Sequence, residues 1–305
     1  MRVTLLGPQR RPTVDQAVAD IDARAPIATV TAGWLEREPD DLELDRMLGG
    51  RSVNLELHRR WLEVLEHDPE YATAELEHRA VLDELQDLYV VQLDNALRAL
   101  YEVAQRGGVP RSRTAAIADA LAVVRLIDER HRDHVWAAHT DFIEAWRPAE
   151  RSFVAAHSAA VSRILADAAA LVVAGGHVGV LVHVLRLFGV RPIESLPLVA
   201  WSAGGMALTE RIVLFHDRIP HGPAHAEVYD DGLGVLTGIV LLPHARRRLR
   251  VDDQQRMSVL ARRFEPATCV VLDDGVRVDL GPDGSLPPGA RVVTEAGRIE
   301  TVDAA

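Results

Sequence analysis

Hydrophobic and polar positions follow two different periods along this chain, and the period changes twice. Near the N-terminus, residues 3–6 and 27–31 are short apolar runs, and each ends in a polar or glycine-bearing loop. Residues 14–24 between them have the spacing of a helix. The pattern therefore predicts a β-α-β unit.

From residue 38 to residue 148 the apolar residues recur at helical spacing among many Glu, Asp and Arg residues. The pattern breaks at 107–110 (Gly-Gly-Val-Pro), resumes at 114 and stops before Pro148. This stretch shows no clear repeat, and it predicts three or four long helices. We expect an all-helical insertion or cap over 38–148, packed against an α/β domain formed by 1–37 and 149–305.

After residue 150 strands and helices alternate again. The predicted strands are 170–174, 198–201, 238–242, 269–272, 276–279 and 291–294, and the predicted helices are 153–168, 179–188 and 252–264. A loop rich in His, Asp and Pro is expected at 216–231. Strands joined by helices predict a three-layer α/β fold, with a mostly parallel sheet flanked by helices and sites at the carboxyl ends of its strands.

Composition narrows the class of protein. The 305 residues are 48% hydrophobic and 26% charged, which is typical of a globular chain. No apolar run reaches membrane-spanning length, and the N-terminus lacks the apolar core of a secretion signal, so we expect a cytoplasmic protein without a membrane partner. The net charge of −11 argues against a nucleic-acid partner.

Two residue types exclude whole classes of chemistry. The sequence contains no lysine, which rules out Schiff-base catalysis, a Walker-A phosphate loop and a Ser-Lys dyad. Its single cysteine, Cys269, lies in an apolar run and is expected to be a buried strand residue. One cysteine allows no intramolecular disulfide and no thiolate metal cluster.

The predicted strand 198–201 runs directly into Ser202, which has small residues on both sides. Ala200-Trp201-Ser202-Ala203-Gly204 follows the nucleophile-elbow pattern G-x-S-x-G, with alanine in the first position. In such an elbow a sharp turn between strand and helix exposes the serine hydroxyl. Ser202 is therefore the candidate nucleophile.

Other predicted strand ends supply partners for this serine. His244 follows the strand 238–242 and is the candidate base, and Asp274 follows the strand 269–272 and is the candidate orienting acid. The backbone N–H groups of Gly175, Gly176 and Ala203 are candidates for an oxyanion hole.

These residues also carry a resemblance to a known family. The elbow, Ala174-Gly175-Gly176-His177, Leu242-Pro243-His244, Gln255-Arg256-Met257 and the glycine-bearing segment 232–236 are similar to the dipeptidase E and cyanophycinase family of serine peptidases. The resemblance covers about 1–36 and 150–280. It implies a class I glutamine amidotransferase-like, or flavodoxin-like, fold with Ser202 as nucleophile, His244 as base and an acid in the turn near Asp274. Asp217 is the alternative acid.

Candidate substrate-binding residues lie near the same strand ends. His177 follows the glycine pair, and Gln9 and Arg10 follow the first strand. Arg246 and Arg248 belong to a basic cluster after His244, which either recognises a substrate carboxylate, as acidic-dipeptide specificity in the family would require, or forms a solvated helix start.

Two groups of histidines resemble metal sites in composition only. We interpret His216, Asp217, His221, His225 and Glu227 as part of a mobile loop beside the nucleophile, and His131, His134 and His139 as a solvated helix face. No metal and no cofactor are expected.

The sequence thus favours a serine hydrolase that cleaves a small peptide, isopeptide or related amide, with a homodimer as an open possibility. The alternative is a catalytically inactive ligand-binding or regulatory protein on an amidotransferase-like scaffold. A glutamine-dependent amidotransferase is disfavoured because that chemistry uses cysteine where this chain has Ser202.

Overall fold

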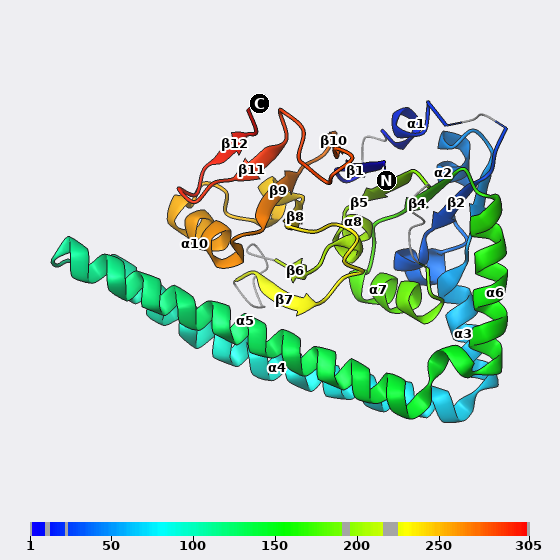
Figure 1. Ribbon diagram of the computed structural model, residues 1–305, viewed down its shortest axis with the longest axis horizontal. Helices are drawn as coiled ribbons and strands as arrows, with labels where there is room; N and C mark the ends of the chain where they lie inside the picture. The colour runs from blue at the N-terminus through cyan, green and yellow to red at the C-terminus, as the bar shows by residue number, and fades with distance from the viewer. Residues whose placement is uncertain (1, 10–12, 22–23, 191–195, 216–224, 304–305) are drawn as a thin grey trace.

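The main sheet of the computed structural model confirms the predicted fold class (Figure 1). The structure describes residues 2–9, 13–21, 24–190, 196–215 and 225–303. The strands are β1 (Val3–Leu6), β2 (Ile27–Val30), β3 (Ser52–Asn54), β4 (Ala170–Val173), β5 (Leu198–Trp201) and β10 (Arg277–Asp279), in the order β10-β1-β5-β4-β2-β3. All neighbours are parallel except β10, which runs antiparallel to β1.

Helices cover both faces of this sheet. Since side chains alternate along a strand, Leu5 and Leu171 pack with α3 (Leu57–His67), α6 (Ser152–Asp167) and α7 (Val178–Leu187). Their neighbours Leu6 and Val172 pack on the other face, with α1 (Val14–Ala17) and α2 (Leu42–Met47). Nearly every residue of β1, β2, β4 and β5 is buried, which is why these strands read as continuous apolar runs.

A second sheet lies beside the first. It consists of β8 (Ile239–Pro243), β9 (Thr268–Leu272), β11 (Arg291–Val293) and β12 (Ile299–Thr301), in the order β12-β11-β9-β8, and only β8 and β9 are parallel. The helices α9 (Ala245–Arg248) and α10 (Gln254–Phe264) connect β8 to β9. The prediction that all strand ends share one sheet is therefore wrong, because apolar runs identify strands but not their neighbours.

Several short strands were not predicted from the pattern of apolar and polar residues. The strands β6 (Ile212–Leu214) and β7 (Glu227–Asp230) form a separate antiparallel pair, and β7 lies inside the stretch expected to be a loop. The strand β3 lies inside the stretch expected to be all helix. Three or four residues are too few for an alternating pattern to be recognised.

Two helices of 37 residues each, α4 (Pro69–Gln105) and α5 (Pro110–Trp146), form a long antiparallel hairpin. At 1.5 Å per residue each is about 55 Å long, and the tip of the hairpin projects past the rest of the molecule at the left of Figure 1. Residues 38–68 instead contain α2, β3 and α3 of the α/β body. How the chain divides into domains stays a prediction.

The middle of the hairpin is fastened to the second sheet by apolar contacts and a buried ion pair. Leu93 and Val124 belong to one cluster with Phe264 and the inward side chains of β8 and β9. The guanidinium of Arg263 donates to both carboxylate oxygens of Asp128, at 2.6 Å each. These two side chains are 2–3% exposed, so the pair holds α5 against α10 away from water.

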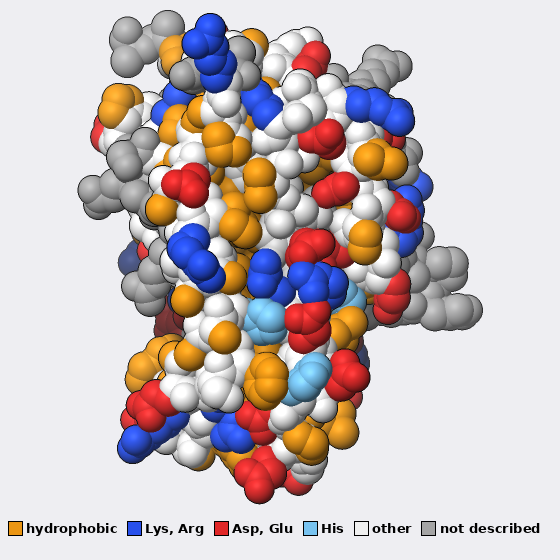
Figure 2. Space-filling view, turned by 90° about the vertical axis from the view of Figure 1, so that its right-hand side faces the viewer, with side chains coloured by type: hydrophobic (Ala, Val, Ile, Leu, Met, Phe, Trp, Pro, Cys, Tyr) orange, Lys and Arg blue, Asp and Glu red, His pale blue; other side chains and the backbone are white. Residues whose placement is uncertain are grey.

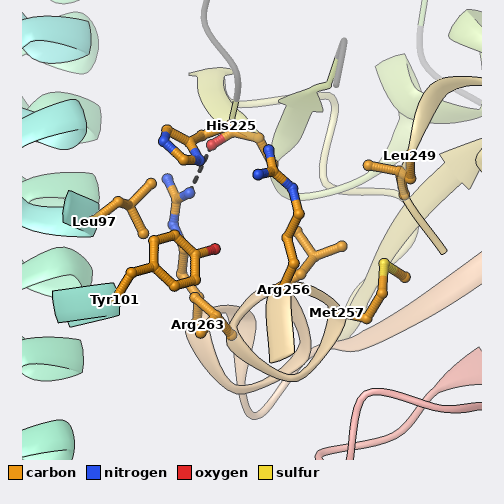
Figure 3. A pocket seen from close by; sticks show the side chains of 10 residues that line it. Leu97, Tyr101, His225, Leu249, Arg256, Met257 and Arg263 are labelled. Atoms are coloured by element: carbon orange, nitrogen blue, oxygen red, sulfur yellow. Dashed lines mark hydrogen bonds between the residues drawn. The ribbon is translucent and has the colours of Figure 1, made fainter. Parts of the chain in front are cut away.

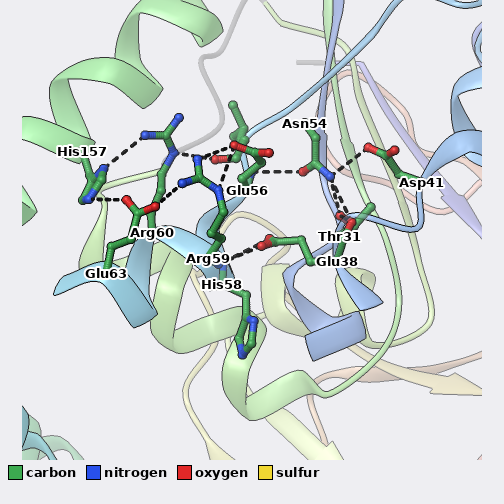
Figure 4. A network of polar contacts seen from close by, with 11 residues as sticks. Thr31, Glu38, Asp41, Asn54, Glu56, His58, Arg59, Arg60, Glu63 and His157 are labelled. Carbon is green, nitrogen blue, oxygen red and sulfur yellow. Dashed lines mark hydrogen bonds and ion pairs between the residues drawn. The ribbon is translucent and has the colours of Figure 1, made fainter. Parts of the chain in front are cut away.

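A polar network fixes the connection between β3 and α3 (Figure 4). The amide of Asn54 donates to Thr31 Oγ1, to the carbonyl of Glu38 and to Asp41. The buried carboxylate of Glu38 accepts two N–H groups in the first turn of α3, from His58 and Arg59. Burial raises the pKa of Glu38 despite these two bonds.

Charged side chains and histidines also gather on the end of the molecule that carries α3 and α6 (Figure 2). His157 of α6 contacts Arg60 at 3.1 Å and Glu63 at 3.3 Å, both on α3.

In the described part of the chain, no helix combines the length and apolarity that crossing a bilayer demands.

Candidate active site

Ser202 occupies a strained turn between β5 and α8 (Ala203–Leu208). Its backbone has φ 50° and ψ −124°, in the region that side-chain-bearing residues rarely adopt. Every residue of β5 and α8 is buried, so both sides of the turn are fixed, while Ser202 itself is half-buried. Ser202 therefore lies at a rigid strand-to-helix turn, and its role as a nucleophile stays a prediction.

Small residues around Ser202 are required by close contacts. A Cβ placed on Gly175 would lie 2.9 Å from the Cβ of Ser202, and one on Gly204 would overlap the carbonyls at the end of β4. The glycine two positions after Ser202 thus lets α8 start directly against β4. The position two before Ser202 is Ala200, which is fully buried in the sheet.

The same backbone conformation occurs at Leu35, inside η1 (Ala32–Arg37), with φ 59° and ψ −126°. Leu35 lies five residues after the end of β2, whereas Ser202 directly follows β5, and the Leu35 side chain carries no reactive group. The conformation alone therefore does not identify a reactive site, and the Ser202 hydroxyl is the group that can take part in chemistry.

Gly7 brings the ends of the two sheets together. Leu6 pairs with Trp201, so Gly7 lies beside Ser202 at the carboxyl edge of the main sheet. A Cβ on Gly7 would overlap the carbonyl of Asp273, and the N–H of Gly7 donates to Val276 O at 2.8 Å. The turn that follows β9 therefore passes next to the elbow.

His244 and Asp274 lie at the matching edge of the second sheet. Pro243 pairs with Leu272, and the N–H of His244 donates to Leu272 O at 3.0 Å. His244 Nδ1 is 3.7 Å from Asp274 Oδ1, which is within ion-pair range and longer than a hydrogen bond. The His244 side chain is 18% exposed and that of Asp274 is 46% exposed, so both remain accessible from outside.

The two neighbouring aspartates of this turn have different surroundings. Asp273 accepts the backbone N–H of Arg246 at 3.0 Å and a guanidinium N–H of Arg291 at 3.2 Å. It thereby holds the start of α9 against β11. Asp274 is the one that faces the imidazole of His244.

The glycine pair after β4 packs against the loop after β2. Gly176 has φ 136°, and a Cβ there would overlap the backbone of Gly33. The next N–H, from His177, donates to Gly33 O at 2.7 Å. Ala203 begins α8, where backbone N–H groups have no carbonyl partner within the helix. The oxyanion-hole role of Gly175, Gly176 and Ala203 stays a prediction.

The candidate substrate-binding residues have mixed surroundings. Gln9 accepts the N–H groups of Thr13 and Val14 at the start of α1, and His177 Nδ1 accepts that of Val180 in α7. Arg246 and Arg248 are exposed, and Arg246 also reaches Asp273. Arg10 and the alternative acid Asp217 lie outside the described residues, as do His216 and His221.

The interpretation of His131 and His139 as part of a solvated helix face is wrong. His131 is 4% exposed and stacks on Tyr89 at 4.1 Å, and burial lowers its pKa. His139 lies 3.3 Å from Asp230 of β7 and 3.1 Å from His78. These histidines face the body because α5 packs its polar side on β7. Among the described residues, no three His, Cys, Asp or Glu side chains form a cluster that could hold a metal.

Burial confirms the prediction for the single cysteine. Cys269 is fully buried in β9, and burial raises the pKa of its thiol to about 12, as expected of a structural residue. A hollow between α4 and α10 is lined by Leu97, Tyr101, His225, Arg256 and Arg263 among others (Figure 3). Its volume of about 20 Å³ is enough for a single water.

Sequence reasoning missed Gly7, Gly33 and Asp273, which shape the site without reacting. A glycine directly after a predicted strand is the signal that could have identified the first one. The roles of Gly33 and Asp273 depend on contacts between loops that are distant in the sequence.

Comparison with known proteins adds little to this description. No protein family and no curated protein matches the chain. Among solved structures, the crystal structure of a peptidase from an acI-B1 Actinobacterium is similar over 99% of this chain and 94% of that one, with 12% sequence identity and a TM-score of 0.42. A likeness that distant supports no conclusion about this chain.

Proposed function

We propose that the chain is a serine hydrolase that cleaves a peptide or related amide through an acyl-enzyme. The observation that carries the proposal is the left-handed backbone of Ser202, at the apex of a turn between a buried strand and a buried helix. Such strain persists only where the surrounding structure enforces it, and it concentrates at functional sites. The approach of the His244 and Asp274 turns to the same edge through Gly7 supports it further.

In the proposed reaction Ser202 Oγ attacks the carbonyl carbon of the substrate while His244 takes the hydroxyl proton. The C=O electron pair moves to oxygen, and the N–H groups of Gly176 and Ala203 stabilise the resulting charge. Asp274 stabilises the imidazolium. The C–N bond then breaks as His244 returns the proton to the leaving amine. Water, deprotonated by His244, releases the acyl group and restores Ser202.

The resemblance to the dipeptidase E and cyanophycinase family belongs to the same proposal. It supports short peptides or isopeptides as substrates, and it makes the exposed arginines of α9 candidates for binding a substrate carboxylate. In this assignment the acid is Asp274, whose carboxylate faces the histidine, and Asp273 has a structural role.

An active-serine probe such as a fluorophosphonate tests the proposal. We expect labelling of the wild-type chain, none of Ser202→Ala and strongly reduced labelling of His244→Ala. Ser112→Ala, at the exposed start of α5, is the matched control and should label like the wild type. A dipeptide and isopeptide library, run on wild type and Ser202→Ala in parallel, then identifies the bond. Equal labelling of wild type and Ser202→Ala would contradict the proposal and favour a binding protein.

A further inference from the structure

The hairpin of α4 and α5 has one face that the rest of the chain does not cover. Most of the large apolar side chains that the described structure exposes lie on this hairpin. Leu88 and Val91 of α4 are 55% and 62% exposed, and Val123 and Leu126 of α5 are 51% and 44% exposed. Large exposed apolar patches in a folded chain mark surfaces that bind a partner.

Helical spacing places these four residues near the middle of the hairpin, each on the side of its helix that faces away from the body. Along α4, Leu88 and Val91 point away from Leu93 and Leu97, which pack on the body, and Val123 and Leu126 likewise point away from buried Asp128. Tyr89 contacts Asp128 and His131 across the hairpin, so the four residues lie within about two helical turns of one another. We call them the central patch.

Between the central patch and the base of the hairpin, the same face is hollowed. The groove has a volume of about 580 Å³ and lies between the two helices. Ala74, Val81 and Leu85 line it from α4, and Ala137 and Ala145 line it from α5. Large side chains, among them His78, Phe142 and Trp146, also line the groove. The alanines of α5 leave the space between them into which a side chain of another helix can pack.

Charge on this face changes sign from one end of the hairpin to the other. The exposed acidic residues near the base are Glu77, Glu84, Asp133, Asp141 and Glu144, and Glu77 and Asp141 line the groove. Of the arginines there, Arg79 pairs with Glu75 and Arg132 pairs with Asp231, while Arg130 is exposed. The five acidic side chains still outnumber the arginines, so the base is acidic on balance. The exposed charges near the tip are Arg98, Arg106, Arg111 and Arg113, against Glu102 and Asp119.

We propose that this face binds a second copy of the chain in antiparallel orientation, forming a four-helix bundle. A two-fold axis near Gln92 places the central patch of one copy on that of the other. It also places each basic tip over the acidic base and groove of its partner. A parallel arrangement would instead set acid on acid and base on base. Self-complementarity of this kind is what a two-fold interface requires, and opposite charges give it its orientation.

Sedimentation or light scattering of the full chain across concentration tests the proposal. We expect a dimer that weakens as salt is added, because the paired charges are exposed. Leu88→Glu combined with Val123→Glu should weaken association by at least about 100-fold, since hydrophobic anchors at the centre of an interface carry most of its affinity. Both residues are exposed, so circular dichroism and thermal unfolding should match the wild type.

Charge reversal supplies a sharper test with an internal rescue. A base variant (Glu77→Arg, Glu84→Arg, Asp141→Arg) and a tip variant (Arg98→Glu, Arg106→Glu, Arg113→Glu) should each be monomeric. When the two variants are mixed, they should form a heterodimer. The base variant is then basic at both ends of its hairpin and the tip variant is acidic at both ends, so opposite charges meet at each end. A single cysteine at Gln92 should cross-link to its own mate, whereas one at Arg113 should not, and Cys269 is buried and does not compete.

A monomer at all concentrations would overturn the proposal. So would a dimer that survives the central-patch substitutions, or one that cross-links at Arg113 rather than at Gln92. None of these outcomes depends on catalysis, so the proposed hydrolase and the proposed dimer stand or fall separately.

Discussion

The edge that carries Ser202 and the seam that fastens the hairpin are built by opposite means. At the edge, backbone geometry places the groups: Ser202 and His244 have positive φ, and Gly176 lies where a side chain would collide with Gly33. At the seam, charged side chains do the placing, through the buried pair of Arg263 and Asp128. One region accepts strain to expose reactive groups, and the other buries charge to hold two helices.

The difference has an energetic meaning. A residue in a sparsely populated backbone region costs of order 1–3 kcal/mol, which its surroundings must offset. A buried ion pair gives little net stability while intact, yet removing one partner leaves an uncompensated charge. Substitutions at the edge should therefore separate activity from stability, whereas substitutions at the seam should lower stability and spare the chemistry.

Ser202→Gly should show the largest effect and the clearest separation. Turnover, and labelling by an active-serine probe, should fall by at least about 10⁴-fold. The free energy of unfolding should not fall, and should rise by up to about 1 kcal/mol, because glycine adopts a positive φ without strain. Urea denaturation beside the kinetic assay checks both. A clear loss of stability would mean that the turn at Ser202 is not strained.

Asp128→Ala should have the opposite profile. It leaves the fully buried guanidinium of Arg263 without its carboxylate, and we expect a loss of about 3–5 kcal/mol in the free energy of unfolding. The labelling rate per folded molecule should stay that of the wild type. Replacing both partners, as Asp128→Leu with Arg263→Met, should recover most of the loss. A double variant as unstable as the single one would show that the pair itself, rather than the orphaned charge, supplies the stability.

Gly176→Ala should lower both the stability of the fold and the activity. The added Cβ combines an unfavourable φ with a collision against Gly33, so the free energy of unfolding should fall by about 3 kcal/mol. Because the same loop supplies a proposed oxyanion donor, turnover should fall as well. Gly189→Ala is the matched control: it too has a positive φ, but open space surrounds it, and it should cost about 1 kcal/mol without affecting turnover.

The sequence predicts the strand ends that carry Ser202 and His244 better than it predicts the contact between α5 and α10. The reason is that the strand ends have signals within a short stretch of sequence. A buried strand followed by small residues around Ser202 is a contiguous signal, and so are the apolar runs that end at Gly175, His244 and Asp274. The fold class follows from the alternation of such runs with helical segments. Each of these features can be read within about ten residues.

The remaining features depend on pairings between distant segments. That β8 pairs with β9 in a separate sheet, rather than joining the main sheet, is decided by tertiary pairing and not by any local pattern. The contact of Gly7 with the Asp273 turn joins residues more than 200 positions apart. Arg263 and Asp128 look like ordinary surface charges in the sequence until α10 packs on α5. His131 and His139 were misread for the same reason, since helical spacing does not tell which polar face meets another element.

The smallest expected effect concerns the pH dependence of the contacts that His78 makes near the base of the hairpin, where it packs against His139 and Phe142. Burial, together with His139 and His183 nearby, lowers the pKa of His78 to about 4, while Glu75 and Asp230 oppose the shift. A histidine in the unfolded chain has a pKa near 6.5. Between about pH 4 and pH 6.5, His78 is therefore mostly protonated in the unfolded chain and mostly neutral in the folded one. The contribution of His78 to stability is therefore complete above about pH 6.5 and is lost as the pH falls towards 4.

Urea denaturation at about pH 7.5 and about pH 5 measures this contribution. Wild type should be less stable at the lower pH, and His78→Gln should show a smaller difference, because glutamine does not titrate. The shifts at His58, His131 and His157 have the same sign, so part of the dependence should remain. His134→Gln, on the exposed side of α5, is the matched control for the loss of an imidazole. If His78→Gln and His134→Gln behaved alike, the burial of His78 near the base of the hairpin would not be a source of the pH dependence.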